Sequence, residues 1–307
     1  MKPEGKDNRR VAVIDLGSNT FHLIIAAVSG LDKSYEIIKR KRIYAYLSRD
    51  GIEHLADNTI KECIEHFGEL HNICEAHQVT EIRAIGTSAL RAASNAHVFL
   101  AAVYNKFGLR IDVIDGVRES ELIYKGLSQS DIDHDQVNLM MDIGGGSVEF
   151  ILCHRYAVLF SESYDIGISV IKNKYRSTDP ISQDEKYTLH DWLNHKLPKF
   201  LAACADYKPN VLVGASGPFE IMESYCGLAS RPHGNKISMS DALQVVDEVT
   251  NRKLSERLEL SYMPEDRADL SRESMLQLEY IFDKVTSLEG LIVSPYSLKE
   301  GLLSEII

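Results

Sequence analysis

Residues 139–150 read LMMDIGGGSVEF, and this stretch has the pattern of a bent β-hairpin. The apolar run 139–141 is typical of a buried strand, and Asp142 ends it. Three glycines at 144–146 then allow a tight turn that brings backbone N–H groups close to a bound anion. A second apolar segment begins at Val148. One carboxylate at the bend of a glycine-rich hairpin predicts a site for phosphate and metal.

The same pattern occurs a second time near the start of the chain. Residues 11–25, VAVIDLGSNTFHLII, align without a gap with residues 138–152, NLMMDIGGGSVEFIL, at a constant offset of 127 residues. An internal repeat of this kind predicts two similar domains that face each other across a cleft. Each domain would bring one carboxylate and one small-residue turn to that cleft. The matched pairs are Asp15 with Asp142, Gly17 with Gly144, Thr20 with Ser147 and Ile24 with Ile151.

Composition and charge limit the class of protein. The chain has 307 residues, of which 44% are hydrophobic and 26% charged, as in ordinary globular proteins of two domains. The apolar segments are too short to span a membrane, and no signal-peptide core follows the N-terminus, so we expect a cytoplasmic protein. The net charge of −11 argues against nucleic-acid binding. The five scattered cysteines favour buried free thiols.

The order of expected elements predicts an α/β protein with mixed sheets. The polar stretch SQSDIDHD at 128–135 marks the junction between a domain of residues 1–128 and one of residues 129–307, with a terminal helix able to pack back on the first. The expected strands are 11–14, 21–28, 34–47, 81–85, 109–114, 139–141, 148–152, 157–164, 210–214 and 290–294. The expected helices are 52–77, an interrupted one from 89 towards 107, 119–126, 182–198, one after 217, one from 241, 270–288 and 298–307.

Asp15 and Asp142 are the first candidate functional residues. A single aspartate at the end of a strand is usually a turn former, but two at matched positions of a repeated hairpin indicate a shared task. Mg²⁺ is bound in proteins by one or two carboxylates together with waters and substrate phosphates. We therefore predict a site for Mg²⁺ (or Mn²⁺) at Asp15, Asp142 and Glu149.

The small residues of the turns are the candidate phosphate ligands, because their backbone N–H groups can approach an anion closely. A third small-residue turn, 214–217, follows another expected strand and would border the same cleft. It lacks the Gly-x-Ser-x-Gly pattern, so we exclude a serine nucleophile. The predicted phosphate-binding residues are Gly17, Ser18, Asn19, Thr20, Gly144, Gly145, Gly146, Ser147, Ser216 and Gly217.

Arg91 and Glu119 each have a functional and a structural interpretation. Arg91 lies one turn into the helix that follows the turn 86–88, where it could bind a phosphate oxygen or lie on the surface beside an ordinary N-cap. Glu119 opens a helix, so its carboxylate either complements the helix dipole or orients and deprotonates a water beside the cleft. Spacing alone does not choose between the two interpretations of Arg91, and for Glu119 it favours the structural one.

Other polar groups favour structural roles. The histidines do not have the spacing of a zinc site, and we expect His22 on a strand or at the rim of the cleft. The run KRKR at 39–42 favours a solvated strand edge, with a track for a polyanion as the less favoured interpretation.

Taken together, five segments resemble the exopolyphosphatase / guanosine-pentaphosphate phosphohydrolase (Ppx/GppA) family. They are IDLGSNTFHLII (14–25), AIGTSALRAASN (84–95), IDVIDGVRESELIY (111–124), MMDIGGGSVEF (140–150) and GASG (214–217). The resemblance covers most of the chain, in order, and is most specific between residues 11 and 150. It implies a short form of the family with two actin-like (ribonuclease H-like) domains, whose mixed sheets are flanked by helices and enclose a cleft.

The resemblance also implies an activity and the residues for it. The family implies a Mg²⁺-dependent hydrolase that releases terminal phosphate from inorganic polyphosphate or a guanosine penta- or tetraphosphate, and by analogy a homodimer. The family's catalytic glutamate falls on Glu119, its phosphate-side arginine on Arg91 and its glycine-loop aspartate on Asp142. Glu119 therefore becomes the first choice for general base.

The chain departs from the family pattern at several positions. Arg118 replaces the first glutamate of the family's Glu-Glu-Ala-Arg motif, and Glu121 replaces its arginine. After Asp269 the family's Leu-Pro-Gly-Gly turn is absent. These departures concern the choice of substrate. Two alternatives to a phosphoanhydride hydrolase stay open. One is an ATP-dependent kinase or ATPase of the same fold, because fold alone does not fix function. The other is a catalytically weak sensor that binds pppGpp or polyphosphate, which the departures near the C-terminus permit.

Overall fold

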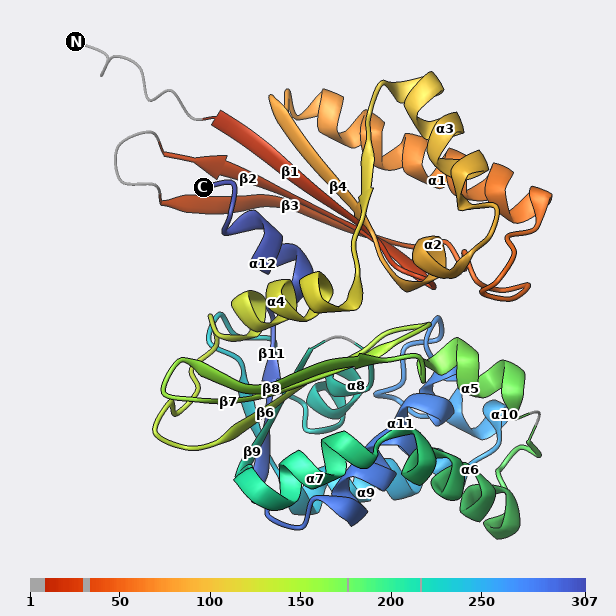
Figure 1. Cartoon of the computed structure of the whole chain (residues 1–307), viewed down its shortest axis with the longest axis vertical. Coiled ribbons are helices and arrows are strands. Elements are labelled where there is room, and N and C mark those ends of the chain that lie inside the picture. The colour runs from red at the N-terminus through yellow and green to blue at the C-terminus, as the bar shows by residue number, and fades with distance from the viewer. Residues whose placement is uncertain (1–8, 30–33, 176, 216) are drawn as a thin grey trace.

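The computed structural model describes residues 9–29, 34–175, 177–215 and 217–307. Within these residues the strands form two mixed sheets, and Figure 1 shows a layer of two helices between them. Further helices cover the outer face of each sheet. This arrangement confirms the predicted fold class of two α/β units with mixed sheets flanked by helices. The division of the chain at residues 128 and 129 stays a prediction.

The first sheet has the strand order β3-β2-β1-β4-β5. Strands β1 and β2 are antiparallel, as are β2 and β3, whereas β1, β4 and β5 run parallel. Apolar side chains of α1 and α3 pack on its outer face. The elements are β1 (Arg9–Leu16), β2 (Thr20–Val28), β3 (Tyr35–Tyr44), α1 (Asp57–Ala76), β4 (Glu81–Gly86), α2 (Ser88–Ala92), α3 (Ala96–Phe107) and β5 (Ile111–Val113).

The second sheet repeats this order, as β8-β7-β6-β9-β11, and adds β10 at one edge. Apolar side chains of the surrounding helices fill the space over its outer face. Its strands are β6 (Asn138–Ile143), β7 (Val148–His154), β8 (Ala157–Tyr164), β9 (Val211–Ala215), β10 (Asn235–Ser238) and β11 (Gly290–Ser294). Its helices are α5 (Ile168–Lys174), α6 (Gln183–Lys196), α7 (Pro198–Tyr207), α8 (Gly217–Tyr225), α9 (Met239–Thr250), α10 (Leu254–Arg257) and α11 (Ala268–Lys284).

Helices α4 (Gly116–Leu127) and α12 (Leu298–Leu303) form the layer between the sheets. They cross closely because both carry glycine at the contact. A Cβ on Gly126 would lie 2.0 Å from the carbonyl oxygen of Ser297, and one on Gly301 would lie 1.8 Å from that of Leu122. Their apolar side chains join those on the inner faces of both sheets in one buried cluster. The two halves are therefore held together by a shared core.

The two copies of the repeat fold alike. Asp15 pairs across its hairpin with His22, and Asp142 pairs with Glu149, so both copies have the same register. The N–H of Gly17 donates to the carbonyl oxygen of Thr20 over 3.0 Å, and the matched bond from Gly144 to Ser147 measures 2.9 Å. The pairing with the next strand shifts register after Ile25 of β2 and after Leu152 of β7, which are also matched positions, because β3 and β8 each contain one extra residue, Ile38 and Leu159.

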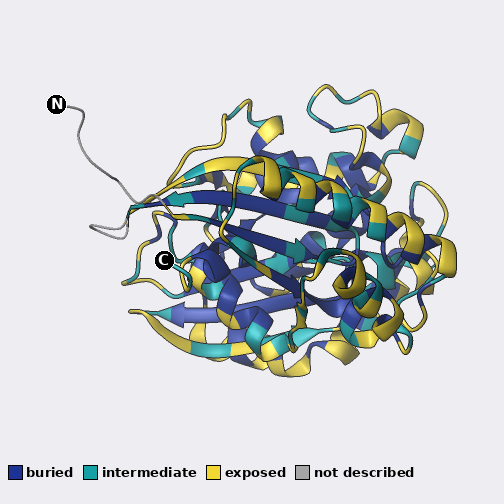
Figure 2. Cartoon of the chain, turned by 90° about the horizontal axis from the view of Figure 1, so that it is seen from above, coloured by how far each residue is buried: buried dark blue, intermediate teal, exposed yellow. Residues whose placement is uncertain are grey.

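Strand interiors are buried and helix outer faces are exposed, as Figure 2 shows. Some predicted boundaries are wrong. The helix expected over 52–77 begins at Asp57, and that expected over 298–307 ends at Leu303. Helix α9 begins at Met239 because Ser238, not Asp241, caps it. The four short elements α5, α7, β10 and α10 were not predicted as separate elements, since short segments show little periodicity.

None of the described helices combines the length and apolar character needed to cross a lipid bilayer. The five cysteines are free thiols, as predicted, and four of them are buried.

Candidate active site

The alternation of side chains along the strands directs the two aspartates into the space between the sheets. Val11 and Val13 of β1 belong to the core between the sheets, and Asp15 lies on their face two residues further along. Met140 belongs to the same core, so Asp142 also points inward. Both carboxylates reach one pocket at the ends of the strands. The sequence prediction that they share a cleft therefore agrees with the structure.

The pocket has about 1050 Å³ of empty space, including its open mouth. Its wall comes from both hairpin turns, from the start of α2, from α4, α8, α11 and α12, and from β3. The lining residues are Asp15, Gly17, Ser18, Asn19, Thr20, His22, Arg42, Tyr44, Thr87, Ser88, Glu119, Asp142, Ile143, Gly144, Gly145, Gly146, Ser147, Glu149, Ile168, Gly217, Ile221, Asp266, Arg267, Leu270, Ser271, Ser274, Ser297 and Leu298.

The carbonyl groups of the glycine turn 144–146 all accept backbone hydrogen bonds. The N–H groups of Gly167, Ile168 and Ser169 donate to the carbonyl oxygens of Gly146, Gly144 and Gly145, over 3.0, 3.0 and 2.7 Å. Within the described residues, no acceptor takes the N–H groups of Gly145 and Gly146. Such a turn, with its carbonyls occupied and its N–H groups available, is suited to an anion.

Close packing explains why this turn is made of glycine. A Cβ on Gly145 would lie 2.8 Å from Nδ2 of Asn19 and 2.8 Å from Cβ of Ser18, in the turn of the other half. A Cβ on Gly146 would lie 2.3 Å from Oγ of Ser88 at the start of α2. The two hairpin turns and the turn 86–88 before α2 therefore meet at one place, and glycine is needed where they touch.

Backbone hydrogen bonds from the residues that follow β3 hold the turn of the first hairpin. The N–H of Ser48 donates to the carbonyl oxygen of Ser18 over 3.0 Å, and that of Tyr46 to the carbonyl oxygen of Asn19 over 2.9 Å. The Ser18 hydroxyl is buried at the pocket wall without a hydrogen-bond partner among the described residues. Thr20 Oγ1 and His22 Nε2 lie 3.0 Å apart.

Burial raises the pKa of both aspartates. The pKa of Asp15 rises to about 7 and that of Asp142 to about 6, and in both cases desolvation by burial is the largest cause. The nearby Lys299 ammonium opposes the rise at both. Oδ1 of Asp15 is buried and has no hydrogen-bond partner among the described residues. A buried carboxylate oxygen without a hydrogen-bond partner is stabilised when it binds a proton or a cation.

Glu149 adds a third buried carboxylate to the wall of this pocket. Its Oε1 accepts a 2.7 Å hydrogen bond from Ser163 Oγ, and burial, then the charge of Glu119, raises its pKa well above the usual value. Yet the part of the chain that the structure describes holds no group of three or more His, Cys, Asp or Glu side chains arranged to bind a metal. Asp15, Asp142 and Glu149 thus do not form a complete cage by themselves. They fit a cation that takes its other ligands from water and substrate, as Mg²⁺ does.

Glu119 lies in the first turn of α4, where the Asp115 side chain caps the helix by accepting the N–H of Arg118 over 2.8 Å. Its carboxylate is buried and accepts a 2.9 Å hydrogen bond from Arg91. Burial raises the pKa of Glu119 to about 7, although the hydrogen bond and charge of Arg91 act in the opposite direction. A carboxylate with such a pKa can accept a proton near neutral pH.

Not every predicted residue lies on the pocket wall. The guanidinium of Arg91 also donates to the carbonyl oxygen of Ile114 over 2.9 Å, and Arg91 is not among the described residues that line the pocket. Its predicted contact with a phosphate stays a prediction. Ser216 lies outside the described residues. Gly217 does line the pocket, with a left-handed φ of 46° and a carbonyl oxygen that accepts from Arg267.

The basic run 39–42 is more than a solvated strand edge. Strand β3 is an edge strand, but its alternate arginines point towards the second half, where Arg40 binds Glu300 of α12 and Arg42 binds Glu220 of α8. Glu220 also pairs with Arg267, which lines the pocket together with Arg42. Sequence reasoning did not assign Arg42, Arg267 or Tyr44 to the site. The period-2 spacing of Arg40 and Arg42 was the available signal.

Comparisons with known proteins agree with this geometry. Residues 25–307 match the sequence model of the Ppx/GppA phosphatase family. A guanosine-5'-triphosphate,3'-diphosphate pyrophosphatase of Photobacterium profundum is 26% identical over 299 residues, which are 96% of this chain and 59% of that protein. The chain thus spans about three fifths of the length of this curated relative.

Solved structures resemble the whole chain. An exopolyphosphatase from Cytophaga hutchinsonii superposes with a TM-score of 0.91 at 29% identity, and the match covers 97% of both chains. A Ppx/GppA family member from Aquifex aeolicus gives a TM-score of 0.79 at 25% identity, again over 97% of both chains. The family match extends over far more than half of the sequence and includes most of the pocket. The chain therefore belongs to the Ppx/GppA phosphatase family.

Proposed function

We propose that the protein is a phosphoanhydride hydrolase that releases the terminal phosphate from inorganic polyphosphate, from pppGpp, or from both. The observation that carries this proposal is the meeting of two equivalent hairpin turns and the carboxylates of Asp15, Asp142 and Glu119 in one pocket. The names of the relatives support the same class of reaction.

The turns would bind the substrate phosphates. The available N–H groups of Gly145 and Gly146, together with the unpartnered Ser18 hydroxyl, offer donors from both halves of the molecule. A phosphate between the turns would therefore be held from two sides. Positioning of this kind supplies much of the rate enhancement of phosphoryl transfer, which needs little covalent help from the protein.

Asp142, Asp15 and Glu149 would hold Mg²⁺ together with the substrate. When bound, the cation offsets the negative charge of the phosphates and of these buried carboxylates. The residues fit such a cation because their carboxylates are buried, have raised pKa values, and in the case of Asp15 lack a partner for Oδ1.

Glu119 would act as the general base. Its buried carboxylate borders the pocket, and its pKa of about 7 suits the acceptance of a proton from water at neutral pH. Arg91 fixes the carboxylate by its 2.9 Å hydrogen bond to Oε2. We therefore assign Arg91 a role in orienting Glu119, beside its predicted contact with the terminal phosphate.

The direct test is phosphate release by the purified protein with Mg²⁺ and, separately, tripolyphosphate, long-chain polyphosphate, pppGpp and ATP. We expect release from at least one of the first three and little from ATP. Release from ATP alone, with labelling of an acceptor, would identify a kinase or ATPase instead. Saturable binding of pppGpp or polyphosphate without turnover would identify a sensor.

Glu119→Gln tests the assigned base. The substitution keeps size and hydrogen bonding but removes the proton acceptor, so we expect turnover to fall by about 10²-fold or more while binding changes little. The matched control is Glu121→Gln on the same helix, since Glu121 is more than half exposed and pairs with Arg118 away from the pocket. Near-normal turnover in Glu119→Gln would remove Glu119 from the mechanism.

A further inference from the structure

Ser169, near the start of α5, forms hydrogen bonds to the turns of both halves. Its N–H donates to the carbonyl oxygen of Gly145 over 2.7 Å, and its hydroxyl donates to Oδ1 of Asn19 over 2.9 Å. These two acceptors belong to the two copies of the repeat. One residue thus spans the cleft between the two turns.

The first half contributes a second hydroxyl to this bridge. Ser48 is buried, and its Oγ lies 3.4 Å from Ser169 Oγ and 3.5 Å from Oδ1 of Asn19. Because the Ser48 N–H also holds the carbonyl oxygen of Ser18, the bridge connects to the backbone of the first turn. Asn19, Ser48 and Ser169 are hereafter called the seryl bridge.

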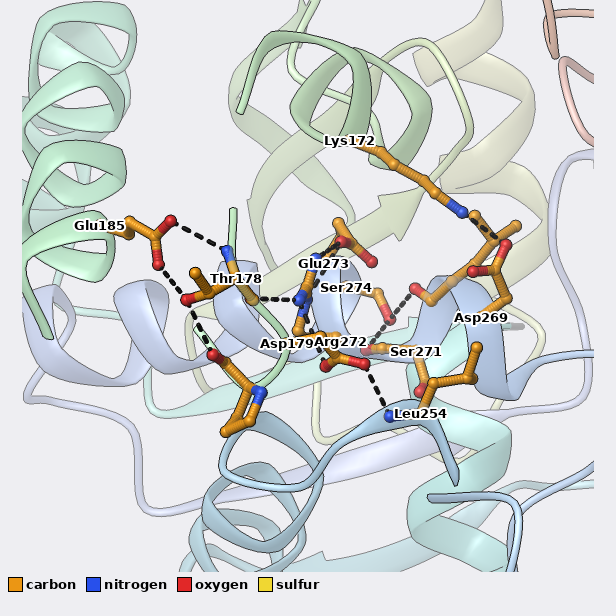
Figure 3. Close-up of polar contacts among 12 residues, drawn as sticks. Lys172, Thr178, Asp179, Glu185, Leu254, Asp269, Ser271, Arg272, Glu273 and Ser274 are labelled. Atoms are coloured by element: carbon orange, nitrogen blue, oxygen red, sulfur yellow. Dashed lines mark hydrogen bonds and ion pairs between the residues drawn. The ribbon is translucent and has the colours of Figure 1, made fainter. Parts of the chain in front are cut away.

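Helix α5 and the residues just before it are attached to the second half, because α11 contacts them at two points. Gln277 of α11 is buried and its Nε2 donates to the carbonyl oxygen of Ile166, directly before the residues that bind the glycine turn. Lys172 of α5 forms an ion pair with Asp269 of α11, as Figure 3 shows. Any separation of the two halves at this edge must therefore break the contact between Ser169 and Asn19.

The seryl bridge also lies at the boundary between two cavities. Asn19 lines the catalytic pocket, whereas Ser169 lines an outer cavity together with Asp50, Ile52 and Lys174. Next to the bridge, a Cβ on Gly146 would lie 2.6 Å from Ile52 Cδ1, so protein atoms fill this part of the boundary too. The bridge therefore lies between the catalytic pocket and the outer cavity.

We propose that Ser169 is a positioning residue that locks the two phosphate-binding turns at their working separation and closes the pocket on the side of the outer cavity. The proposal rests on the proposed function, because the lock matters only if both turns hold one substrate. Its hydroxyl stabilises the closed arrangement before substrate arrives, so less of the binding free energy is spent on closure.

The test compares Ser169→Ala with Ser169→Thr and with a matched control, Ser287→Ala. Ser287 also makes one side-chain hydrogen bond, of 2.7 Å to the carbonyl oxygen of Pro209, in a different part of the second half. Loss of one hydrogen bond corresponds to about a threefold to tenfold change in an equilibrium. In Ser169→Ala we expect KM for the hydrolysed substrate to rise about threefold to tenfold while kcat stays within about twofold. Ser169→Thr should restore KM.

Hydrogen exchange gives a readout that does not depend on turnover. The amides of Tyr46 and Ser48, which hold the first turn, should exchange faster in Ser169→Ala than in the wild type, Ser169→Thr and Ser287→Ala. If the wild type hydrolyses none of the substrates, the proposed function is wrong. The exchange rates then test by themselves whether Ser169 holds the two turns together. Unchanged exchange at Tyr46 and Ser48, or a KM change equal to that of Ser287→Ala, would overturn the proposal.

Discussion

The hairpins 11–25 and 138–152 share their register, their turn hydrogen bond and the place where their pairing with the next strand shifts, but they bring different charges to the pocket. In the first copy the cross-strand partner of Asp15 is His22, and Arg42 of the adjoining strand borders the pocket. In the second copy the partner of Asp142 is Glu149.

This difference indicates that the two halves have different roles in the pocket. Burial holds the pKa of His22 well below its usual value, so the imidazole is neutral, and the first copy offers one carboxylate to a pocket that Arg42 of the adjoining strand also lines. The second copy offers two carboxylates and a turn of three glycines. In the proposed mechanism the second copy would supply two carboxylates to the cation and its turn N–H groups to the phosphate, whereas the first copy would supply Asp15 and the Ser18 hydroxyl from the opposite side.

We expect the largest difference between the two hairpins when their aspartates are replaced, in Asp142→Asn and Asp15→Asn. We expect Asp142→Asn to lower kcat/KM by about 10²–10³-fold, as removal of a main electrostatic group does. Asp15→Asn should cost less, about tenfold, because only Asp142 has a second carboxylate, that of Glu149, as its cross-strand partner. Steady-state phosphate release at saturating Mg²⁺ measures both. Equal losses would show that the halves hold the cation equally.

Glu149→Gln and His22→Gln compare the cross-strand partners directly. The first should weaken apparent Mg²⁺ affinity by about 10–100-fold, because a carboxylate near the cation is lost. The second should leave Mg²⁺ affinity within about threefold, since a neutral imidazole contributes no charge. Titration of activity against Mg²⁺ distinguishes them, and a larger effect of His22→Gln would reverse the assignment.

The glycine turn can be tested at the position where the copies differ, Gly145 against Ser18. Gly145→Ala puts a methyl group 2.8 Å from Asn19 Nδ2 and should lower the free energy of unfolding by about 1–3 kcal/mol. Ser18→Gly makes no such contact and should cost no more than about 1 kcal/mol. Urea denaturation measures both values. A Ser18→Gly variant less stable than Gly145→Ala would contradict the need for glycine at position 145.

The pH dependence of stability should separate the aspartates by their pKa values. A folded-state pKa above the unfolded value contributes stability at low pH that is lost as pH rises to the folded pKa, by about 1.4 kcal/mol per pH unit for each group. Without Mg²⁺, Asp15→Asn should therefore gain stability relative to wild type from about pH 4 until about pH 7, and Asp142→Asn until about pH 6.

Thermal unfolding in a pH series measures this difference in stability. The titration of His22 adds the same pH dependence to wild type and variants if its environment is unchanged. Stabilisation of the wild type by Mg²⁺ should also grow over the same range, because the cation binds the deprotonated carboxylates. Curves for wild type and Asp15→Asn that stay parallel at every pH would contradict the raised pKa of Asp15.

The repeat was the most informative part of the sequence. Because backbone register and side-chain alternation follow from the strand pattern, the matched positions Asp15 and Asp142 could be placed in one cleft before any coordinates were known. The fold class followed from the order of strands and helices. Glu119 could be favoured as base only through the resemblance to the Ppx/GppA family, since its spacing also fits a residue that complements the helix dipole.

Other features depend on contacts between distant segments, which local patterns do not encode. The pairing of Arg42 and Arg267 through Glu220 joins residues far apart in the chain. The bond from Ser169 to Asn19 spans 150 residues, and α5 itself is too short to show a helical period. The contact of Arg91 with Glu119 likewise joins two helices, α2 and α4, across 28 residues of sequence.

The central claim is that both hairpins hold one string of phosphates. The most direct measurement is a crystal structure of Glu119→Gln with Mg²⁺ and tripolyphosphate. We predict phosphate oxygens within hydrogen-bonding distance of the turn 17–20 and of the turn 144–147, with the cation at Asp142. Phosphates that contact only one of the two turns, or that lie outside the space between Asp15 and Asp142, would contradict the account.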